Sequence, residues 1–401
     1  MLWLILFSLI LFILLLPAIG AIFLYFFRKN SLLVVELSNV YPVANKALLL
    51  EFEVKNLGSF HSIILNIDLN LLPPISFKHK KILESNSNYF DTVILKSNKA
   101  KVFRFLYEFD GSIPVDQIIS NSNLSVGIIL TYYDLKPIRF MYREFNLARY
   151  LRNKIDSLSE NEFTFNDSLA NKSIDIIAKQ DVFCLKTPII THFHTIQDLV
   201  NLILQGITRV EKSNLKKLIV CISESVIAII QKRTRCVYDI EPSEIAQLFN
   251  HYFDQDSSLS SPYGLEMVLR DIGFARFYFS LYPGIIGKLL GISGMFYVFA
   301  GRKAAAVDDA GGTIRPYDKY VVLAPENTNQ TAKQIKQKLI ESLNSDIDLE
   351  VCIVDANDLG KVDILGTTSF DTNQIVINKI KTNPQGNDDQ QTPVVFIPIY
   401  Q

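Results

Sequence analysis

Residues 349–358, LEVCIVDAND, join an apolar run to an abrupt acidic end. The run is typical of a strand that is buried on both faces, and Asp355, Asn357 and Asp358 follow it directly. LKKLIVCIS (215–223) predicts a second strand of the same kind. In open α/β sheets, ligands bind outside the carboxyl ends of such strands. These strands therefore decide the fold class and indicate where a site should lie.

Helical patterns separate the predicted strands. Thr195 and Asp198 have capping-box spacing and precede apolar residues at helical period. NTNQTAKQIKQKLIESL (327–343) predicts an amphipathic helix, and Pro242 suits the first turn of another. Because strands alternate with helices, we predict an α/β (mixed α+β) domain over residues 182–401.

A different texture precedes this domain. Residues 30–150 contain short runs of period two, such as ALLLEFEV and KVFRFLYEF, separated by Asn, Gly, Pro and Ser. This pattern predicts an all-β, immunoglobulin-like sandwich without a catalytic constellation, which favours a spacer or interaction module. The polar residues 151–181 are interpreted as a linker.

The N-terminus predicts a membrane helix. Leu2 to Phe27 contains no charge and spans about 39 Å as a helix, enough to cross a bilayer. A cleaved signal peptide would have a basic start and a shorter apolar stretch. Arg28 and Lys29 follow the span and nothing basic precedes it. We therefore expect a transmembrane helix over residues 1–29, a single-pass protein of the cell membrane, and cytoplasmic soluble domains.

Composition and spacing disfavour several other classes. A net charge of -1 lacks the basic excess of a nucleic-acid binder. The four cysteines occur singly, which disfavours a disulfide framework or a zinc site. GIIGKLLG (284–291) has the wrong spacing for a phosphate-binding loop. His192 and His194 lie two apart, but without a third ligand nearby a structural role is favoured.

Residues 274–301 are unusually apolar. They suggest either membrane contact or burial in a core or dimer interface. Pro283 and several glycines interrupt the stretch, so we favour burial in a core or dimer interface over membrane contact.

Two acidic turns are the candidates for chemistry. AVDDAGG (306–312) places Asp308 and Asp309 beside glycines, and VDANDLG (354–360) has a similar composition. Carboxylates in such turns can share Mg²⁺ or Mn²⁺ with substrate phosphates. The alternative for each is an ordinary solvated turn whose Asp and Asn side chains bond the local backbone. Each turn taken alone favours this ordinary interpretation, whereas two such turns in one domain raise the expectation of one composite metal–phosphate site.

Several motifs occur in an order that resembles a known family. They are KTPII (186–190), IVCISESVIAIIQKR (219–233), AGRKAAAVDDAGGTIRPYDKYVVLAPEN (300–327), VCIVDANDLG (351–360) and NPQGNDDQQTP (383–393). Over about residues 182–400 the chain is similar to the coenzyme F420-0:L-glutamate ligase family, and closest to a divergent bacterial branch.

The resemblance implies a GTP-dependent ligase. A carboxylate of the acceptor is activated as an acyl phosphate, and the amine of L-glutamate attacks it to form a γ-glutamyl amide. Mg²⁺ or Mn²⁺ bridges nucleotide phosphates and acidic residues. The family fold is an unusual α/β arrangement, commonly a homodimer.

The resemblance also implies site residues. The metal candidates are Asp308, Asp309, Asp355 and Asp358, the substrate-proximal catalytic candidates are Ser223 and Glu224, and the cofactor-binding candidates are Gly311, Gly312 and Asn357. Family members carry a Ser-Asp-Thr-Phe-Gly turn where this chain has VDANDLG, so either Asp of that turn can be the equivalent. Two alternatives stay open: a non-catalytic, membrane-tethered scaffold, and an amide ligase acting on a cell-envelope precursor.

Overall fold

The computed structural model describes most of the chain. The described residues are 2–27, 32–43, 47–72, 77–82, 90–109, 124–136, 138–147, 175–179, 181–210, 214–255, 257–343, 347–357, 360–386 and 390–400. Three of the sequence-based expectations fall outside them: the basic pair Arg28 and Lys29, most of the linker, and Asp358.

The chain divides into two compact units. One comprises Met1–Leu169 with Ile240–Leu269, and the other comprises Ala170–Asp239 with Arg270–Gln401. Each unit is described by itself.

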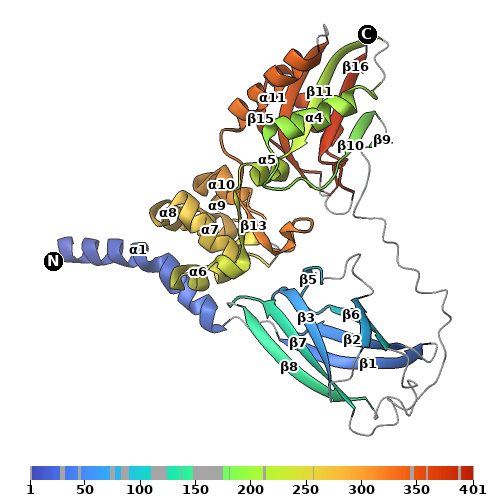
Figure 1. The fold of residues 1–401 in the computed structure, drawn as a ribbon. Helices are drawn as coiled ribbons and strands as arrows, with labels where there is room; N and C mark the ends of the chain where they lie inside the picture. Colours follow the sequence, from blue (N-terminus) through green and yellow to red (C-terminus); the bar gives the residue numbers. More distant parts are fainter. Residues whose placement is uncertain are drawn as a thin grey trace. The chain divides into compact units, whose positions relative to one another are not determined.

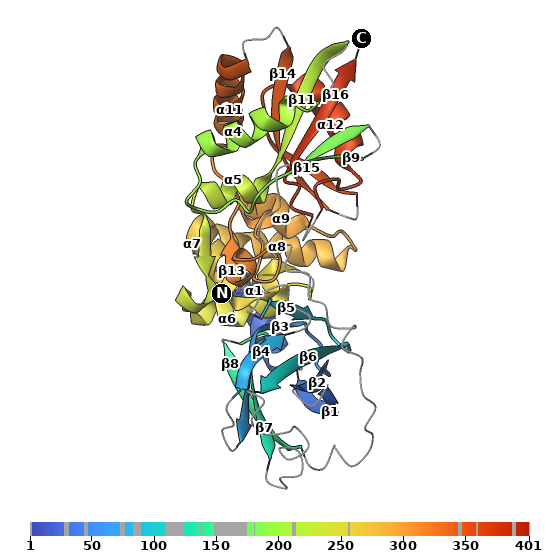
Figure 2. The ribbon, with the colours of Figure 1, turned by 45° about the vertical axis from the view of Figure 1, so that its right-hand side comes forward.

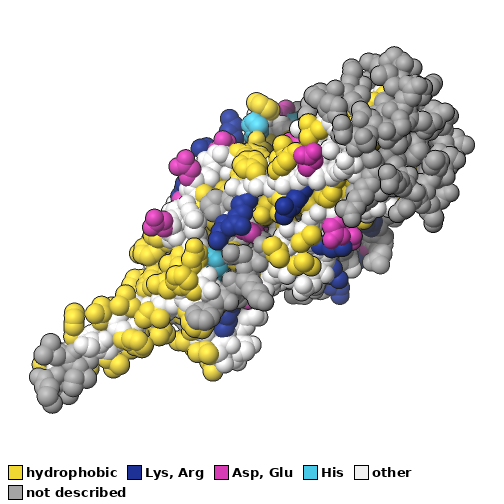
Figure 3. All heavy atoms as spheres, turned by 90° about the horizontal axis from the view of Figure 1, so that it is seen from below, with side chains coloured by type: hydrophobic (Ala, Val, Ile, Leu, Met, Phe, Trp, Pro, Cys, Tyr) yellow, Lys and Arg dark blue, Asp and Glu magenta, His cyan; other side chains and the backbone are white. Residues whose placement is uncertain are grey.

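The first unit begins with the predicted apolar helix, α1 (Leu2–Phe27). Figure 3 shows it as an almost continuous hydrophobic surface. Within the described residues, only this helix is long and apolar enough to cross a membrane, and 11% of its most apolar window is buried. Near the end of the helix, the Tyr25 ring lies 5.2 Å from that of His251. The helix is confirmed, while membrane crossing stays a prediction, because an apolar helix near the N-terminus can also belong to a signal sequence.

Two four-stranded sheets follow (Figure 1). Their strands are β1 (Leu33–Val43), β2 (Ala47–Asn56), β3 (Ser62–Leu72), β4 (Phe77–Ile82), β5 (Val93–Leu95), β6 (Ala100–Phe109), β7 (Ser125–Tyr133) and β8 (Arg139–Asn146). The sheet orders are β1-β2-β6-β4 and β5-β3-β7-β8, and all paired strands are antiparallel. One core joins both sheets, with Phe52 and Phe105 from the first and Leu69 and Ile128 from the second. The predicted β-rich region is therefore a two-sheet sandwich, and its immunoglobulin-like subtype stays a prediction.

Residues 240–269 belong to this first unit. They form α6 (Glu244–Phe249), η4 (Asn250–Tyr252), η5 (Ser258–Ser260) and most of α7 (Pro262–Ile272).

Polar and aromatic contacts explain the placement of this segment. Asn250 Nδ2 donates to the Leu135 carbonyl at 3.0 Å, and the backbone N–H of Ile138 donates to Tyr263 Oη at 2.7 Å. The rings of Tyr133 and Tyr263 lie 4.8 Å apart. The sequence analysis predicts that this segment belongs to the domain over residues 182–401. In the structure, its side chains bond within the first unit.

The second unit is built on a six-stranded sheet of order β15-β14-β11-β16-β10-β9. The strands are β9 (Asp175–Lys179), β10 (Val182–Lys186), β11 (Leu215–Ser223), β14 (Asp348–Ala356), β15 (Val362–Thr367) and β16 (Val394–Tyr400). β11 and β14 are parallel with Cys221 opposite Cys352, and the other neighbours are antiparallel. Residues 175–179, which the sequence places in the linker, are a strand because they pair with β10.

Helices cover both faces of this sheet (Figure 2). α4 (Ile196–Ile207), α5 (Glu224–Ile230) and α11 (Thr328–Leu343) pack on one face, and α12 (Asn373–Ile380) packs on the other. Along β11, Val220 faces the first layer and Ile219 faces the second. Burial on both faces is the reason that the central strands are uninterrupted apolar runs. The mixed α/β class is confirmed.

Smaller elements complete the unit. They are β12 (Thr234–Cys236), η3 (Val237–Asp239), α8 (Phe274–Leu289), α9 (Met295–Ala300), α10 (Arg302–Ala305), η6 (Tyr317–Lys319), β13 (Tyr320–Val322) and η7 (Phe370–Thr372). β12 and β13 pair as a separate two-stranded sheet.

A half-buried ion-pair network joins this small sheet to the helices. Arg233 Nη2 lies 3.0 Å from Asp271 and its Nη1 lies 3.0 Å from Glu326. Lys303 contacts the same two carboxylates at 3.5 and 3.0 Å. The side chains of Arg233 and Asp271 are only 16% and 13% exposed, so removal of one partner leaves a charge in a poorly solvated place.

Arg233→Met is therefore expected to lower the free energy of unfolding by about 2–4 kcal/mol, because Asp271 loses its closest cation. Arg233→Met with Asp271→Leu should recover part of that loss, because no orphaned charge remains. Lys379→Met is the matched control: it breaks an ion pair with the well-exposed Asp181 and should cost less than about 1 kcal/mol. Urea unfolding of the three variants measures this, and equal losses in Arg233→Met and Lys379→Met would contradict it.

Candidate functional site

Two carboxylates lie at the carboxyl ends of the parallel strands. β11 ends at Ser223, and Glu224 begins α5 directly after it. In the parallel register Ser223 pairs with Val354, so Asp355 follows on β14 at the level of Glu224. This is the edge at which the sequence predicts a site.

The AVDDAGG turn brings a third carboxylate. Asp308 exchanges two backbone hydrogen bonds of 2.9 Å with Val322 of β13. The N–H of Gly311 donates to the Asp318 carbonyl at 2.7 Å, and Gly311 has a φ of +84°, which favours glycine. Backbone pairing and this turn fix the position of Asp308.

Glu224, Asp308 and Asp355 form what we call the carboxylate cluster. Burial, then Asp355 and Asp309, raises the pKa of Asp308 to about 7. Burial, then Asp355 and Asp308, raises the pKa of Glu224 well above its usual range. Burial and Asp363 raise the pKa of Asp355. Since burial and each ionised carboxylate disfavour ionisation of the next, the cluster favours protonated carboxyl groups at neutral pH, and a bound cation would favour their ionised forms.

Sequence reasoning missed two participants, one on β15 and one directly before it. Asp363 lies opposite Asp355 in the antiparallel register, and Lys361 Nζ lies 2.6 Å from Asp363. Lys361 lowers the pKa of both Asp355 and Glu224. The signal was the turn VDANDLG followed by KVD, because a short hairpin returns the chain to the same sheet edge.

The cluster fits a hard cation in its chemistry. Glu224 is 7% exposed, and its buried Oε2 has no hydrogen-bond partner in the structure. Carboxylate oxygens are ligands that Mg²⁺ and Mn²⁺ prefer. Among the described residues, however, no three His, Cys, Asp or Glu side chains are already close enough to hold a metal ion. Charge and ligand type match the cation, while a closed coordination shell is not formed.

Four of the five motifs line one pocket beside the cluster. Its volume is about 130 Å³. The lining residues are Thr187, Pro188, Ile189, Ile190, Ser223, Ser225, Val226, Ile229, Gly312, Thr313, Ile314, Gln385, Gly386, Gln391, Thr392 and Pro393. Segments separated by up to two hundred positions in the sequence therefore share one cavity, which we call the motif pocket.

Backbone bonds hold the walls of the motif pocket together. The N–H of Ser223 donates to the Pro393 carbonyl at 2.8 Å, and that of Thr187 donates to the Gln391 carbonyl at 3.0 Å. The Ser223 side chain makes no cap hydrogen bond to α5, so helix capping does not consume its hydroxyl.

Gly312 connects the pocket to the cluster. A Cβ atom at this position would lie 3.1 Å from the Asp309 carbonyl oxygen and 3.6 Å from Asp308 Cβ. The pocket wall and the carboxylate cluster thus share the AVDDAGG turn.

The remaining predicted site residues differ in whether they lie near the cluster or the motif pocket. Asp309 is buried and acts on Asp308, but it is not among the groups that shift Glu224 or Asp355. Asn357 Oδ1 accepts from the Lys361 N–H at 3.1 Å, which is the local turn that the alternative interpretation expects. Gly311 does not line the motif pocket.

The two histidines have structural partners. His192 Nδ1 lies 2.7 Å from the hydroxyl of Tyr317, and His194 Nδ1 accepts from the Thr191 N–H at 3.0 Å. These contacts support the structural role favoured from sequence.

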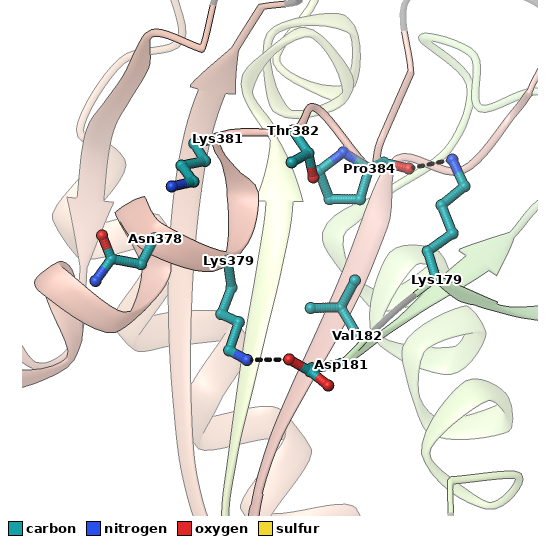
Figure 4. Close-up of a pocket in the computed structure, with 8 residues that line it drawn as sticks. All are labelled: Lys179, Asp181, Val182, Asn378, Lys379, Lys381, Thr382 and Pro384. Atoms are coloured by element: carbon teal, nitrogen blue, oxygen red, sulfur yellow. Dashed lines mark hydrogen bonds and ion pairs between the residues drawn. The ribbon is translucent and has the colours of Figure 1, made fainter.

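A roomier pocket of about 420 Å³ lies elsewhere in this unit (Figure 4). Lys179 donates to the Pro384 carbonyl at 2.9 Å, and Lys379 pairs with Asp181 at 2.6 Å. No member of the carboxylate cluster lines it. Because two of its lysines are already bonded and do not converge, we place the candidate site at the motif pocket.

Comparisons with known proteins bear on this unit. A family model described as F420-0:Gamma-glutamyl ligase matches residues 185–397, which is more than half of the chain. The match contains the motif pocket and the carboxylate cluster. No curated protein matches the chain.

Solved structures give only distant likenesses. The GAE domain of GGA2p from Saccharomyces cerevisiae is 18% identical, with 30% of this chain and 96% of that chain covered and a TM-score of 0.20. The archaellum periplasmic stator protein FlaG from Sulfolobus acidocaldarius is 12% identical, with 28% and 100% covered and a TM-score of 0.16. TM-scores this low carry no argument about fold or function.

The raised pKa of Asp308 predicts a pH-dependent stability. The folded state binds this proton more tightly than the unfolded state does, so the contribution to stability is present below about pH 4 and is lost as the pH rises to about 7. In the presence of a chelator, Asp308→Asn should therefore be more stable than the parent above about pH 7, by on the order of 2–4 kcal/mol, with a smaller difference at about pH 5.

Denaturant unfolding across this pH range measures the difference. Asp348→Asn is the control, because Asp348 lies at the exposed opposite end of β14. A difference between Asp308→Asn and the parent that does not change with pH would contradict the electrostatic account of the cluster.

Proposed function

Because the chain belongs to the F420-0:gamma-glutamyl ligase family, we propose that its second unit is a GTP-dependent ligase that forms a γ-glutamyl-type amide bond. The observation that carries the proposal is that distant family motifs line one pocket, beside buried carboxylates whose pKa values are raised.

The reaction has two balanced steps. A carboxylate oxygen of the acceptor attacks the γ-phosphorus of GTP, and GDP leaves as the acyl phosphate forms. The amine of L-glutamate then attacks the acyl carbon, phosphate leaves with the bonding electron pair, and the amine loses a proton. Negative charge accumulates on phosphate oxygens in the first step, which requires nearby positive charge.

The carboxylate cluster would hold that charge. Asp308 and Asp355 would bind Mg²⁺ or Mn²⁺, which neutralises phosphate charge when bound. Both acids raise the pKa of Glu224, which therefore belongs to the same proposed site. Asp309 and Asp358 remain further proposed ligands. We assign Glu224 to this cluster on the observed coupling, in addition to the substrate-proximal role implied by resemblance.

The motif pocket would receive the reacting end of a substrate. Pockets that enclose a whole small-molecule ligand usually measure about 300–1,000 Å³, so a cavity of about 130 Å³ accommodates one part of it. Gly312 admits close approach to the backbone, and the Ser223 hydroxyl can hydrogen-bond a carboxylate or phosphate oxygen. Gly311 and Asn357 remain proposed nucleotide contacts, and a homodimer remains implied by the family.

We further propose that α1 anchors this enzyme in the cell membrane with its soluble units in the cytoplasm. The supporting observations are the charge-free span of α1, its low burial, and the basic residues that follow it in the sequence. The sandwich would then serve as a spacer or interaction module.

The scaffold alternative makes a different geometric expectation. In a scaffold that retains only the fold, nothing requires the two acidic turns to converge. The charge of Asp355 contributes to the raised pKa of Asp308, so the two turns lie within electrostatic reach, which supports the enzyme over the scaffold.

Binding of GTP with Mn²⁺ is expected to raise the Tm of the full chain, and Asp308→Asn and Asp355→Asn should each reduce that shift by most of its size. The reason is that each substitution removes a negative oxygen from the proposed cation site. Asp348→Asn should keep the full shift, because Asp348 lies at the other end of β14.

Calorimetric titration of the same variants gives the affinities. If GTP with Mn²⁺ leaves the Tm of the parent unchanged, or if the two cluster variants bind as the control does, the proposed site is wrong.

A further inference from the structure

The helices α8 and α9 expose a large apolar surface. We call residues 274–300 the apolar hairpin. Its exposed large hydrophobic residues are Phe274, Phe279, Ile286, Leu289, Leu290, Ile292, Val298 and Phe299. From sequence we favour burial of this stretch in a core or a dimer interface. Burial in the core of the chain is wrong for these side chains, because they are exposed in the structure.

The hairpin packs internally through a different set of residues. The rings of Phe277 and Phe296 lie 5.8 Å apart, and a Cβ atom at Gly287 would lie 2.6 Å from Met295 Cγ. Gly287 thus lets the two helices approach closely. These contacts form the inner face of the hairpin, and the exposed side chains form its outer face.

The exposed apolar residues of the outer face follow the helical period of α8, and their exposed fraction is highest at the turn after this helix. Phe279, Ile286 and Leu290 are spaced by seven and four residues, so they follow one stripe of α8 and continue into its end. At the turn, every residue from 288 to 294 is exposed, and Leu289 is 81% exposed. Val298 adds a 72% exposed side chain on α9. The apolar surface is a projecting tip.

The charged side chains within residues 272–307 are all positive, whereas Asp271, Asp308 and Asp309 flank this segment in the sequence. The cations are Arg276, Lys288, Arg302 and Lys303. Lys303 pairs with Asp271 and Glu326 at 3.5 and 3.0 Å, and Arg276 and Arg302 donate to the carbonyls of Phe299 and Ile364. Apolar and aromatic side chains combined with Lys and Arg are typical of segments that lie in the interface of an anionic bilayer.

This charge argues against a second copy as the partner. A two-fold contact would bring the same positively charged surface against itself, and no acid of the hairpin could compensate. Anionic lipid headgroups complement these cations, and the acyl boundary accepts the tip.

We propose that the apolar hairpin docks on an anionic lipid bilayer, with the side chains of its tip at the boundary between headgroups and acyl chains. The proposal rests on the proposed anchoring by α1, which supplies the bilayer.

The depth of single tryptophans tests the proposal in the full chain. Trp3, the only natural tryptophan, is 82% exposed on α1 and reports insertion of that helix. The double variant Trp3→Phe, Leu289→Trp reports the tip of the hairpin. The double variant Trp3→Phe, Ile340→Trp is the matched control, because Ile340 is an exposed apolar residue of α11, outside the hairpin. Each protein is reconstituted into vesicles of phosphatidylcholine and phosphatidylglycerol with lipids brominated just below the headgroup.

The expected result is that the fluorescence of Leu289→Trp falls by about half in brominated vesicles, while that of Ile340→Trp is unchanged, since bromine quenches only at short range and the tip lies shallowly in the interface. Replacing phosphatidylglycerol by phosphatidylcholine should reduce the quenching.

The outcomes separate the two proposals. Quenching of Trp3 without quenching of Leu289→Trp overturns docking and leaves the anchor intact. Quenching of Leu289→Trp without quenching of Trp3 overturns the anchor and leaves docking intact. A blue-shifted emission of Leu289→Trp that depends on protein concentration and not on bromine identifies a second copy of the chain and overturns docking.

Discussion

The burial of three carboxylates at one edge of the sheet is the constraint on which the site of the second unit depends. Glu224, Asp308 and Asp355 approach one another from three different segments, and each is disfavoured in its charged form. Such an arrangement persists only when the surrounding structure holds it. The sheet supplies that support, because β11 and β14 pair directly and are buried on both faces. β13 holds Asp308 by two backbone bonds from the third side.

Much of the architecture follows from local sequence. The runs LKKLIVCIS and LEVCIVDAND are strands because their residues are buried on both faces, and Thr195 with Asp198 forms the predicted capping box. Periodicity reveals such features because it depends on neighbours in the chain. The pairing of β11 with β16, or of the 240–269 segment with the sandwich, depends on contacts between distant residues and leaves no periodic signal.

The candidate site was predictable only in part for the same reason. The two acidic turns are visible as composition, and their occurrence in one domain suggests a shared site, but spacing alone does not show that they meet. Asp363 carried no motif of its own and joins the site because a hairpin returns it opposite Asp355. The apolar hairpin shows a related difficulty: a run of aromatic and aliphatic residues indicates burial, yet the sequence does not say whether the same chain, a second copy or lipid buries it.

The account of the site can be tested most directly by locating the cation. Crystals of the full chain grown with Mn²⁺ and a non-hydrolysable GTP analogue, measured by anomalous scattering at the manganese edge, give its position without reference to activity. The account predicts a manganese peak coordinated by oxygens of Asp308 and Asp355, with Glu224 adjacent and the nucleotide phosphates extending into the motif pocket. A manganese peak elsewhere, or ordered nucleotide with no manganese at these carboxylates, would contradict it.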